Sequence, residues 1–343
     1  DISISQQDSF FGSSSQEKCC VFTPGSWTYL RLPAIHEPAI QLGIPQSYYD
    51  NGDGIDSTKI SGDSAIAFLN LEQDGYLRPF DVAGILWPTG YMLSLCLGNL
   101  VGCPIPELHQ LIKEYQDNFE KSNSDETHLN HPLLAIELGA GIGASSIALS
   151  TSLQNLGFPV SSQDGNSQPW VVATDLAPHA LALTIANANN NNVVVETANM
   201  DHFDQSSIQE VKKEFFPQKN ENADRQTRNL PNSNGFSLVF GSSLLGLFQD
   251  THRLDSTLWQ ILDQLLDSNN PNALVILAHN REDALRLPPE SEFAYRLVRR
   301  LSGSDDFFGN MKSRAGDSSD FEVSVIQRKA TECRNDPMSS TDD

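Results

Sequence analysis

Residues 132–150 read PLLAIELGAGIGASSIALS, and this stretch decides the fold. The apolar residues 133–136 predict a short buried strand, which ends at Glu137. Residues 139–143 hold three glycines and form a turn, and residues 144–149 are small or apolar at helical spacing. Such a turn has permissive backbone dihedrals, little side chain to block a ligand, and free N–H groups at the helix start. The stretch therefore predicts a strand, a ligand-binding turn and a helix.

Two cofactor classes bind at turns of this kind. Gly139, Gly141 and Ala144 fit a dinucleotide fingerprint, which is a weak signal by itself. Glu137, two residues before the first glycine, separates the classes better: residues 137–143, ELGAGIG, resemble the first motif of the S-adenosylmethionine-dependent methyltransferases with a seven-stranded sheet. The resemblance implies S-adenosyl-L-methionine as cofactor. A nicotinamide or flavin site and a turn without a ligand are the alternatives. The cofactor residues implied here are Glu137, Gly139, Ala140 and Gly141.

A second buried strand, residues 170–176, ends in an acid at Asp175. A carboxylate at such a strand end can accept hydrogen bonds from both hydroxyl groups of a ribose. The separation from Gly143 is 175 − 143 = 32 residues, longer than the usual spacing of about 20, and the polar stretch 161–169 accounts for the excess. Asp175 is therefore the predicted ribose ligand, and an ordinary strand-end or N-cap aspartate is the alternative.

A tryptophan and a proline open a predicted helix at residues 84–97, with Pro88 near its first turn. This helix resembles one in the small protein-lysine methyltransferases, where the tryptophan lies against the cofactor. The resemblance covers about residues 75–329 and implies a cofactor contact for Trp87. A tryptophan that only fills the core is the alternative.

Three more residues complete the predicted cofactor site. Asp201 and His202 stand where the same family places an aspartate and a tryptophan beside the adenine ring, so a flat imidazole replaces the indole. A surface histidine is the alternative for His202. Ser242, near the end of a fourth predicted strand, residues 236–243, is also assigned to the cofactor.

The end of that fourth strand departs from the family pattern. The family has an acidic residue there and a tyrosine three positions later, whereas this chain has Ser243 and Gly246. Methyl transfer is an in-line displacement that needs positioning and an unprotonated nucleophile. A lysine amine must therefore lose its proton, helped by desolvation or by a nearby carboxylate that accepts the proton. The sequence therefore assigns no catalytic residue. Asp250 and residues 279–281 are the next candidates to position a substrate.

Charge and cysteine usage restrict the partners and the compartment. Lys+Arg 22 against Asp+Glu 44 give a net charge of −22, which repels phosphate backbones and anionic membranes and favours a basic protein partner. The five cysteines show no metal-ligand spacing and no disulfide framework, as expected for reduced thiols in the cytoplasm or also the nucleus. We expect no metal, no nucleic-acid partner, no membrane association and a monomer.

The remaining pattern predicts one α/β domain with a mostly parallel sheet. The family resemblance adds a closing antiparallel hairpin, so the expected fold is a Rossmann-like seven-stranded sheet with a small N-terminal β-rich extension. Strands are expected at residues 193–196, 273–278 and 321–326, and helices at 107–119, 144–156, 178–189, 251–266 and 290–301. The expected divisions are a disordered tail at 1–20, the extension at 21–74, the methyltransferase domain at 75–329 with polar insertions near 161–169 and 212–234, and a second disordered tail at 330–343.

The resemblance implies a methyltransferase that acts on a lysine side chain of a protein substrate. A small-molecule methyltransferase of the same fold is one alternative. The other is a methyltransferase-like scaffold that binds the cofactor without turnover, because the substrate-side residues of the family are missing at Ser243 and Gly246.

Overall fold

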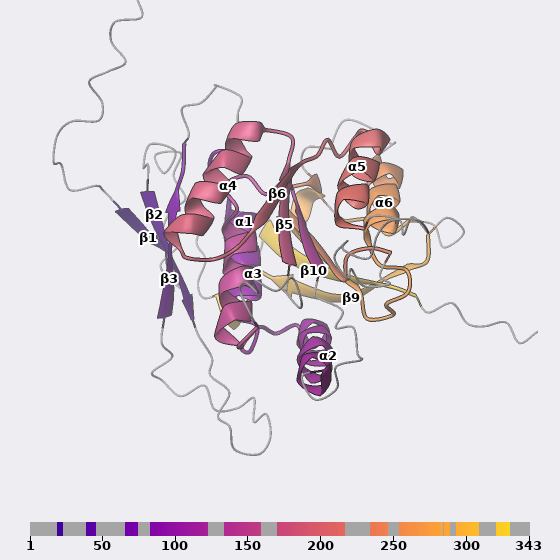
Figure 1. Cartoon of the computed structure of the whole chain (residues 1–343), viewed down its shortest axis with the longest axis horizontal. Helices are drawn as coiled ribbons and strands as arrows, with labels where there is room; N and C mark the ends of the chain where they lie inside the picture. Colours follow the sequence, from indigo (N-terminus) through magenta and orange to yellow (C-terminus); the bar gives the residue numbers. More distant parts are fainter. Residues whose placement is uncertain are drawn as a thin grey trace, which may run out of the picture.

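A computed structural model of the chain contains two sheets and six α-helices among the residues that it describes (Figure 1). The description covers residues 19–22, 39–45, 66–74, 83–122, 134–158, 170–216, 234–245, 254–283, 285–288, 293–308 and 320–329. The predicted C-terminal tail, the polar stretch 161–169, Gly246 and Asp250 lie outside these residues, as do residues 1–18 of the predicted N-terminal tail.

The central sheet has seven strands in the order β6-β5-β4-β7-β8-β10-β9. The first five are parallel, whereas β10 pairs antiparallel with both β8 and β9. This arrangement confirms the expected fold class, including the closing antiparallel hairpin. The strands are β4 (Leu134–Leu138), β5 (Trp170–Asp175), β6 (Glu196–Asn199), β7 (Leu238–Ser242), β8 (Leu274–Asn280), β9 (Tyr295–Ser302) and β10 (Phe321–Arg328).

Helices cover both faces of the central sheet because its inner strands are apolar on both sides. One apolar cluster joins the sheet to α1, α2 and α3, and a second joins its other face to α5 and α6. The helices are α1 (Pro88–Gly98), α2 (Pro106–Ser122), α3 (Ala144–Asn155), α4 (Pro178–Asn190), α5 (Gln205–Phe215) and α6 (Leu254–Leu265). Within the described residues, no helix has both the length and the apolar character needed to cross a bilayer.

A small sheet of β1 (Cys19–Phe22), β2 (Ala39–Pro45) and β3 (Ile66–Glu72) packs beside α1, α3 and α4 (Figure 1). Its inward side chains belong to the same apolar cluster as α1. The contact is close: a Cβ atom added to Gly98 of α1 would lie 2.5 Å from Cδ1 of Ile44 in β2. Helix α1 is therefore covered by a sheet on two sides, which explains why it is buried around its whole circumference.

The asparagine-rich end of α4 bonds the small sheet to the central domain. Asn191 accepts a hydrogen bond from Asn70 N (2.8 Å) and donates to Asn70 O (2.7 Å). Asn187 does the same with Glu72 N (2.6 Å) and Glu72 O (3.0 Å), and its amide also reaches Ile142 O at 3.0 Å. Two side-chain amides thus satisfy main-chain groups of β3 that would otherwise lie at a sheet edge.

The expected helix at residues 290–301 is wrong, because residues 295–302 form strand β9. The pairing of β9 with β10 shifts between Val325 and Ile326, so that Arg299 pairs with Val325 while Leu297 pairs with Ile326. The extra residue, Val298, is a β-bulge that resets the alternation of side chains. The resulting apolar spacing of about three residues imitates a helical period.

Three other boundaries differ from expectation. The third parallel strand, expected at residues 193–196, is residues 196–199, because its register is set by pairing with β5 and not by the apolar run before it. Helix α5 reaches Phe215, so the polar insertion expected from residue 212 does not begin there. Strand β1 includes Cys19 and Cys20, which had been placed in the N-terminal tail. Strand β2 lies within the expected β-rich extension at residues 21–74.

The asparagine bonds give a first prediction. Asn187→Ala should lower the free energy of unfolding by about 2 kcal/mol, because the fully buried Asn187 amide bonds the main-chain groups of Glu72 and the buried main-chain oxygen of Ile142. Urea denaturation of the purified chain measures this. Asn190→Ala is the matched control, since its amide makes an exposed bond to Glu72 Oε1 and should change stability by less than about 0.5 kcal/mol. Equal effects of the two substitutions on the free energy of unfolding would show that the bonds of Asn187 to β3 do not stabilise the fold.

Candidate functional site

The candidate site lies at the carboxyl ends of the parallel strands. Strand β4 pairs with β5 on one side and with β7 on the other. The strands β4, β5 and β6 follow one another in one direction across the sheet, and β7 and β8 follow on the opposite side of β4. Ligands of open α/β sheets bind at such a switch point, outside the carboxyl ends of the strands. The turns that follow β4, β5, β6 and β7, together with the start of α1, therefore define the site.

The turn after β4 depends on its glycines. Gly139, Gly141 and Gly143 have φ angles of 65°, 56° and 78°, a region that side chains disfavour. A Cβ atom added to Gly143 would also lie 2.5 Å from Cγ2 of Thr184 in α4. One added to Gly141 would lie 2.8 Å from the main-chain oxygen of Ala83, just before α1. The turn is thus held closely between α4 and the segment that leads into α1.

Glu137 is 2% exposed and bonds the first turn of α3. Its Oε2 accepts hydrogen bonds from Ser146 N at 3.0 Å and from Ser146 Oγ at 2.6 Å. Gly143, the residue at the N-cap position, has no side chain to cap the helix. The carboxylate therefore supplies from β4 the cap that the glycine cannot. The structure gives Glu137 a supporting role beneath the predicted cofactor site.

Burial has a second effect on Glu137. The removal of the carboxyl group from water raises its pKa from 4.5 to about 7, and the bonds from Ser146 oppose part of this rise. A dinucleotide would place its pyrophosphate at the same helix start, where it needs free N–H groups and no negative charge. Because Glu137 already occupies the N–H group of Ser146, the site disfavours that class of ligand.

Asp175 ends β5 and is 7% exposed. Its Oδ2 accepts a hydrogen bond from Gly141 N at 2.9 Å, and its Oδ1 accepts one from Ala177 N at 2.8 Å. An ionised carboxylate has about four acceptor positions, so about two remain for a ligand. The structure thus brings Asp175 to the glycine turn, and its role as a ribose ligand stays a prediction.

His202 follows β6 and lies near the same aspartate. Burial lowers the pKa of its imidazole, and the charges of Asp175 and Asp201 oppose that shift. The Nε2 atom is buried and has no hydrogen-bond partner among the described residues. Unpaired buried polar atoms are rare in folded proteins. His202 therefore has a free polar edge, as a ligand-binding residue would. Asp201 bonds Phe203 N through Oδ1 at 2.9 Å, which shapes the turn.

Two apolar side chains stand exposed at these strand ends, and the sequence analysis did not assign them to the site. Leu176 is 60% exposed directly after Asp175, and Phe203 is 59% exposed directly after His202. The bonds from Asn199 Nδ2 to the main-chain oxygens of Asp175 and Leu176, 3.1 and 3.0 Å, hold the two strand ends together. An apolar residue just after a strand-end acid is the signal that could have identified Leu176.

Trp87 and Ser242 lie on the opposite side of the turn. Trp87 is the N-cap residue of α1 and is 39% exposed, so it is not a fully buried core residue. A Cβ atom added to Gly90 of α1 would lie 3.3 Å from Ser242 Oγ, which places the end of β7 against the first turn of α1. Both residues thus border the carboxyl edge, at the end of the site away from His202, and their contact with a cofactor stays a prediction.

The position of the family's acidic residue is used differently here. Ser243 has a φ angle of 55°, and its hydroxyl group shares a hydrogen bond of 2.5 Å with Thr89 Oγ1. The hydroxyl groups of β7 and α1 are therefore bonded to each other. His279, another candidate to position a substrate, is 1% exposed and bonded through both ring nitrogens. It cannot contact a substrate directly.

Comparison with known proteins gives only distant similarities. No family model matches the chain, and no curated protein matches it. Among solved structures, TrmN from Thermus thermophilus is 15% identical, with 63% of this chain and 48% of that chain covered and a TM-score of 0.34. The matched part is thus about half of that protein.

Two further solved structures show similarly low sequence identities and TM-scores. The ribosomal protein L11 methylase of Lactobacillus delbrueckii subsp. bulgaricus is 17% identical, with 65% and 80% of the two chains covered and a TM-score of 0.31. The Pyrococcus abyssi tRNA (uracil-54, C5)-methyltransferase, in complex with S-adenosyl-L-homocysteine, is 11% identical, with 85% and 50% covered and a TM-score of 0.33. Similarity at this level carries no argument about function, which rests on the geometry of the site.

The raised pKa of Glu137 predicts a specific pH dependence. A carboxyl group whose folded-state pKa is above its unfolded value stabilises the fold fully below about pH 4.5, and this contribution is lost as the pH rises through about 7. Relative to Glu137→Gln, the native chain should therefore lose about 2 kcal/mol of unfolding free energy between about pH 5 and about pH 8. Chemical denaturation of both proteins at the two pH values measures the difference. A difference that does not change with pH would show that Glu137 is not buried as described.

Proposed function

We propose that this protein is an S-adenosyl-L-methionine-dependent methyltransferase. The observation that carries the proposal is the buried carboxylate of Glu137 at the start of α3, next to a second carboxylate, Asp175, that keeps free acceptor positions. The first disfavours a pyrophosphate at the glycine turn, and the second favours a ribose. S-adenosyl-L-methionine contains a ribose and no phosphate, so it satisfies both conditions.

The chain's own residues fit the parts of this cofactor. Asp175 would accept hydrogen bonds from the ribose hydroxyl groups, and His202 has a free Nε2 edge on the same side of the turn. Leu176 and Phe203 offer exposed apolar surface for an aromatic base. The glycine turn and Trp87 border the remaining part of the site. When bound, the cofactor supplies an electrophilic methyl group.

We propose a lysine side chain of a protein as the methyl acceptor. The support is the resemblance described above together with the acceptor side of the site, which offers hydroxyl groups and an exposed tryptophan in place of a carboxylate. Neutral groups at this position do not stabilise an ammonium ion, which favours the deprotonated amine that the reaction needs. Trp87 can pack against the aliphatic part of a lysine side chain.

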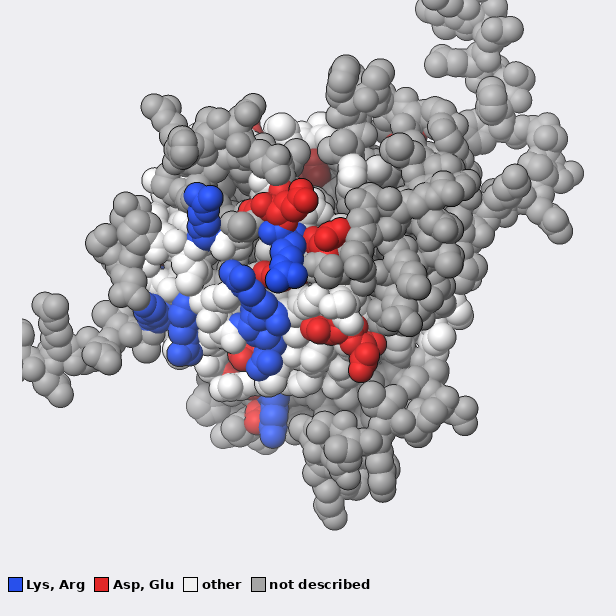
Figure 2. Space-filling model, turned by 180° about the vertical axis from the view of Figure 1, so that it is seen from behind, with Lys and Arg blue, Asp and Glu red and all other residues white. Residues whose placement is uncertain are grey.

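The distribution of charge supports a protein partner over a nucleic acid. The face shown in Figure 2 carries Lys and Arg side chains with Asp and Glu side chains beside them. The hairpin of β9 and β10 contributes arginines that are already paired, and the net charge of −22 further disfavours a phosphate backbone. The pairs are Arg299 with Glu107 (3.2 Å), Arg300 with Glu322 (3.2 Å) and Arg328 with Asp263 (2.7 Å).

Two alternatives follow from specific observations. Ser243 stands where the family has an acid, and its hydroxyl group is hydrogen-bonded to that of Thr89. This favours a scaffold that binds the cofactor without turnover. The lack of assigned acceptor residues leaves a small-molecule substrate as the other alternative. Both share the cofactor site with the main proposal and differ from it in the fate of the methyl group.

The cofactor proposal predicts a large loss of affinity when Asp175 is changed. Asp175→Asn, which keeps the shape of the side chain, should weaken binding of S-adenosyl-L-homocysteine by well over about tenfold, because a charge-assisted pair of hydrogen bonds is lost. Calorimetry measures the affinity, and circular dichroism confirms that the variant is folded. Asp204→Ala is the control, since Asp204 caps α5 at the same edge through Ser206. Unchanged affinity in Asp175→Asn, or preferential binding of NAD, would contradict the proposal.

The acceptor proposal predicts where a labelled methyl group goes. The full chain, incubated with methyl-labelled cofactor and a cell lysate, should transfer the label into protein, and hydrolysis should release the label as methylated lysine. The Asp175→Asn variant should lose this activity. Label in the small-molecule fraction would favour the small-molecule alternative, and cofactor binding without any labelled product would favour the scaffold.

A further inference from the structure

Asn280 is the last residue of β8, and its side chain is exposed at the carboxyl edge of the sheet. Ser242 pairs with Ala278, so Asn280, two residues later, points to the same face as these two residues, the face that α1 covers. Ser243 N bonds Ala278 O at 2.9 Å, which keeps the end of β7 beside that of β8. In the part of the chain that the structure describes, the Asn280 amide makes no hydrogen bond.

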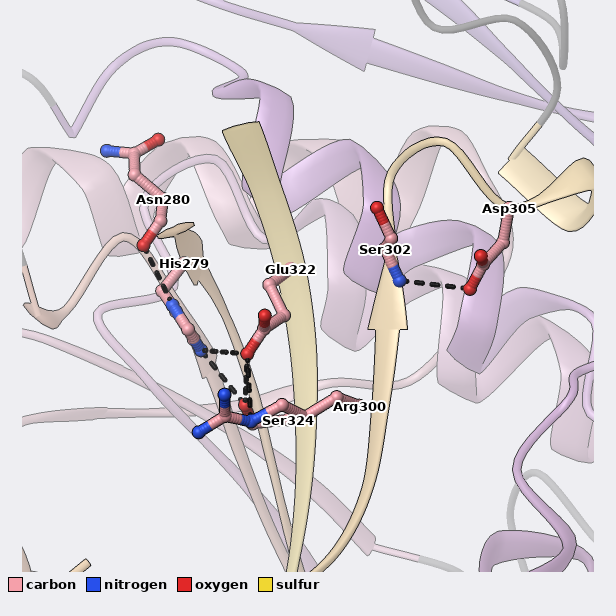
Figure 3. Close-up of polar contacts among 7 residues, drawn as sticks. All are labelled: His279, Asn280, Arg300, Ser302, Asp305, Glu322 and Ser324. Carbon is pink, nitrogen blue, oxygen red and sulfur yellow. Dashed lines mark hydrogen bonds and ion pairs between the residues drawn. The ribbon is translucent and has the colours of Figure 1, made fainter. Parts of the chain in front are cut away.

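A polar cluster lies directly behind Asn280, on the other face of β8, and all of its members except Arg300 are buried (Figure 3). His279 is 1% exposed; its Nδ1 lies 2.9 Å from the main-chain oxygen of Asn280, and its Nε2 lies 3.0 Å from Ser324 Oγ. Glu322 Oε1 lies 3.8 Å from the same Nε2 and 3.2 Å from Arg300 Nε. The cluster thus connects β8 through β10 to β9.

The cluster fixes the main chain at Asn280. A carbonyl oxygen only accepts hydrogen bonds, so the Nδ1 atom of His279 must carry the proton that bonds Asn280 O. On the other side of the ring, Nε2 bonds Ser324 Oγ and lies near Glu322, and Glu322 is itself held by Arg300. Burial of His279, Ser324 and Glu322, which are 1%, 0% and 9% exposed, costs free energy that apolar side chains would not cost. The arrangement is therefore more specific than packing of the strands requires.

We propose that Asn280 binds the amine that accepts the methyl group, and that His279, with Ser324, Glu322 and Arg300, positions it. This inference rests on the proposed function. The Asn280 side chain stands one strand away from the position of the missing family acid, on the α1 side of the sheet. Its amide oxygen can accept a hydrogen bond from an amine N–H without the negative charge that would stabilise the ammonium form. In the transfer, the amine lone pair forms the new N–C bond as the C–S bond breaks, and the amine proton leaves to water.

The test separates acceptor binding from cofactor binding. The full chain is saturated with S-adenosyl-L-homocysteine and titrated with Nα-acetyl-L-lysine methylamide, a probe of the lysine side chain, while NMR shifts report binding. Asn280→Ala should lower the affinity for the probe by about fivefold, the effect of one lost hydrogen bond. It should leave the affinity for S-adenosyl-L-homocysteine unchanged. Asn190→Ala, a change of the same residue type at the far end of α4, should alter neither affinity.

A second pair of variants tests the positioning residue. His279→Leu should lower the affinity for the probe, although the substitution keeps the site packed. His279→Asn, whose amide can donate a hydrogen bond near the place of Nδ1, should keep most of the native affinity. A role limited to stability would lower the melting temperature in both variants and leave the affinity for the probe the same. Cofactor affinity is measured in each variant and should stay constant.

Three results would overturn the inference: no binding of the probe to the native chain, equal binding by Asn280→Ala, or equal binding by His279→Leu and His279→Asn. Failure of the proposed function has a different signature, because the native chain would then not bind S-adenosyl-L-homocysteine at all. Calorimetry with that ligand alone distinguishes the two cases.

Discussion

The bond between the carboxylate of Glu137 and the first turn of α3 is the interaction on which the site depends. The glycine turn needs Gly143 at a positive φ angle and close to Thr184, so the N-cap position cannot carry a side chain of its own. Without an acceptor, the N–H group of Ser146 would be left unpaired in the core. Glu137 in the preceding strand accepts the hydrogen bond from Ser146 N, and the same carboxylate disfavours a phosphate ligand at the turn.

Two carboxylates at neighbouring strand ends thus have different tasks because their surroundings differ. Glu137 is directed into the helix, where burial raises its pKa to about 7. Asp175 is directed at the turn itself, bonds Gly141 N and Ala177 N, and keeps acceptor positions for a ligand. One acid builds the turn and the other, held by that turn, is available for binding. This division of roles is the basis for proposing a ligand with a ribose and no pyrophosphate.

The second support of the site comes from outside the central domain. The small N-terminal sheet covers α1, and the amides of Asn187 and Asn191 fix that sheet to α4. Because the first turn of α1 carries Trp87 and Thr89 to the end of β7, the sheet also determines where these side chains stand. Residues that look like an unrelated extension and a low-complexity asparagine run are therefore part of the structure that shapes the acceptor side.

The strand, turn and helix around Gly141 and the acid at Asp175 could be predicted from the sequence, because apolar runs, glycines and strand-end acids are local signals that each act within a few residues. The other features follow from contacts between distant parts of the chain. Strand β9 looked helical because a bulge at Val298 breaks its alternation, and a bulge is visible only when two strands are paired. The unpaired Nε2 of His202, the capping role of Glu137 and the cluster behind Asn280 arise from contacts between residues far apart in the chain. Such contacts leave no periodic trace in the sequence, because they are fixed by the packing of the sheet.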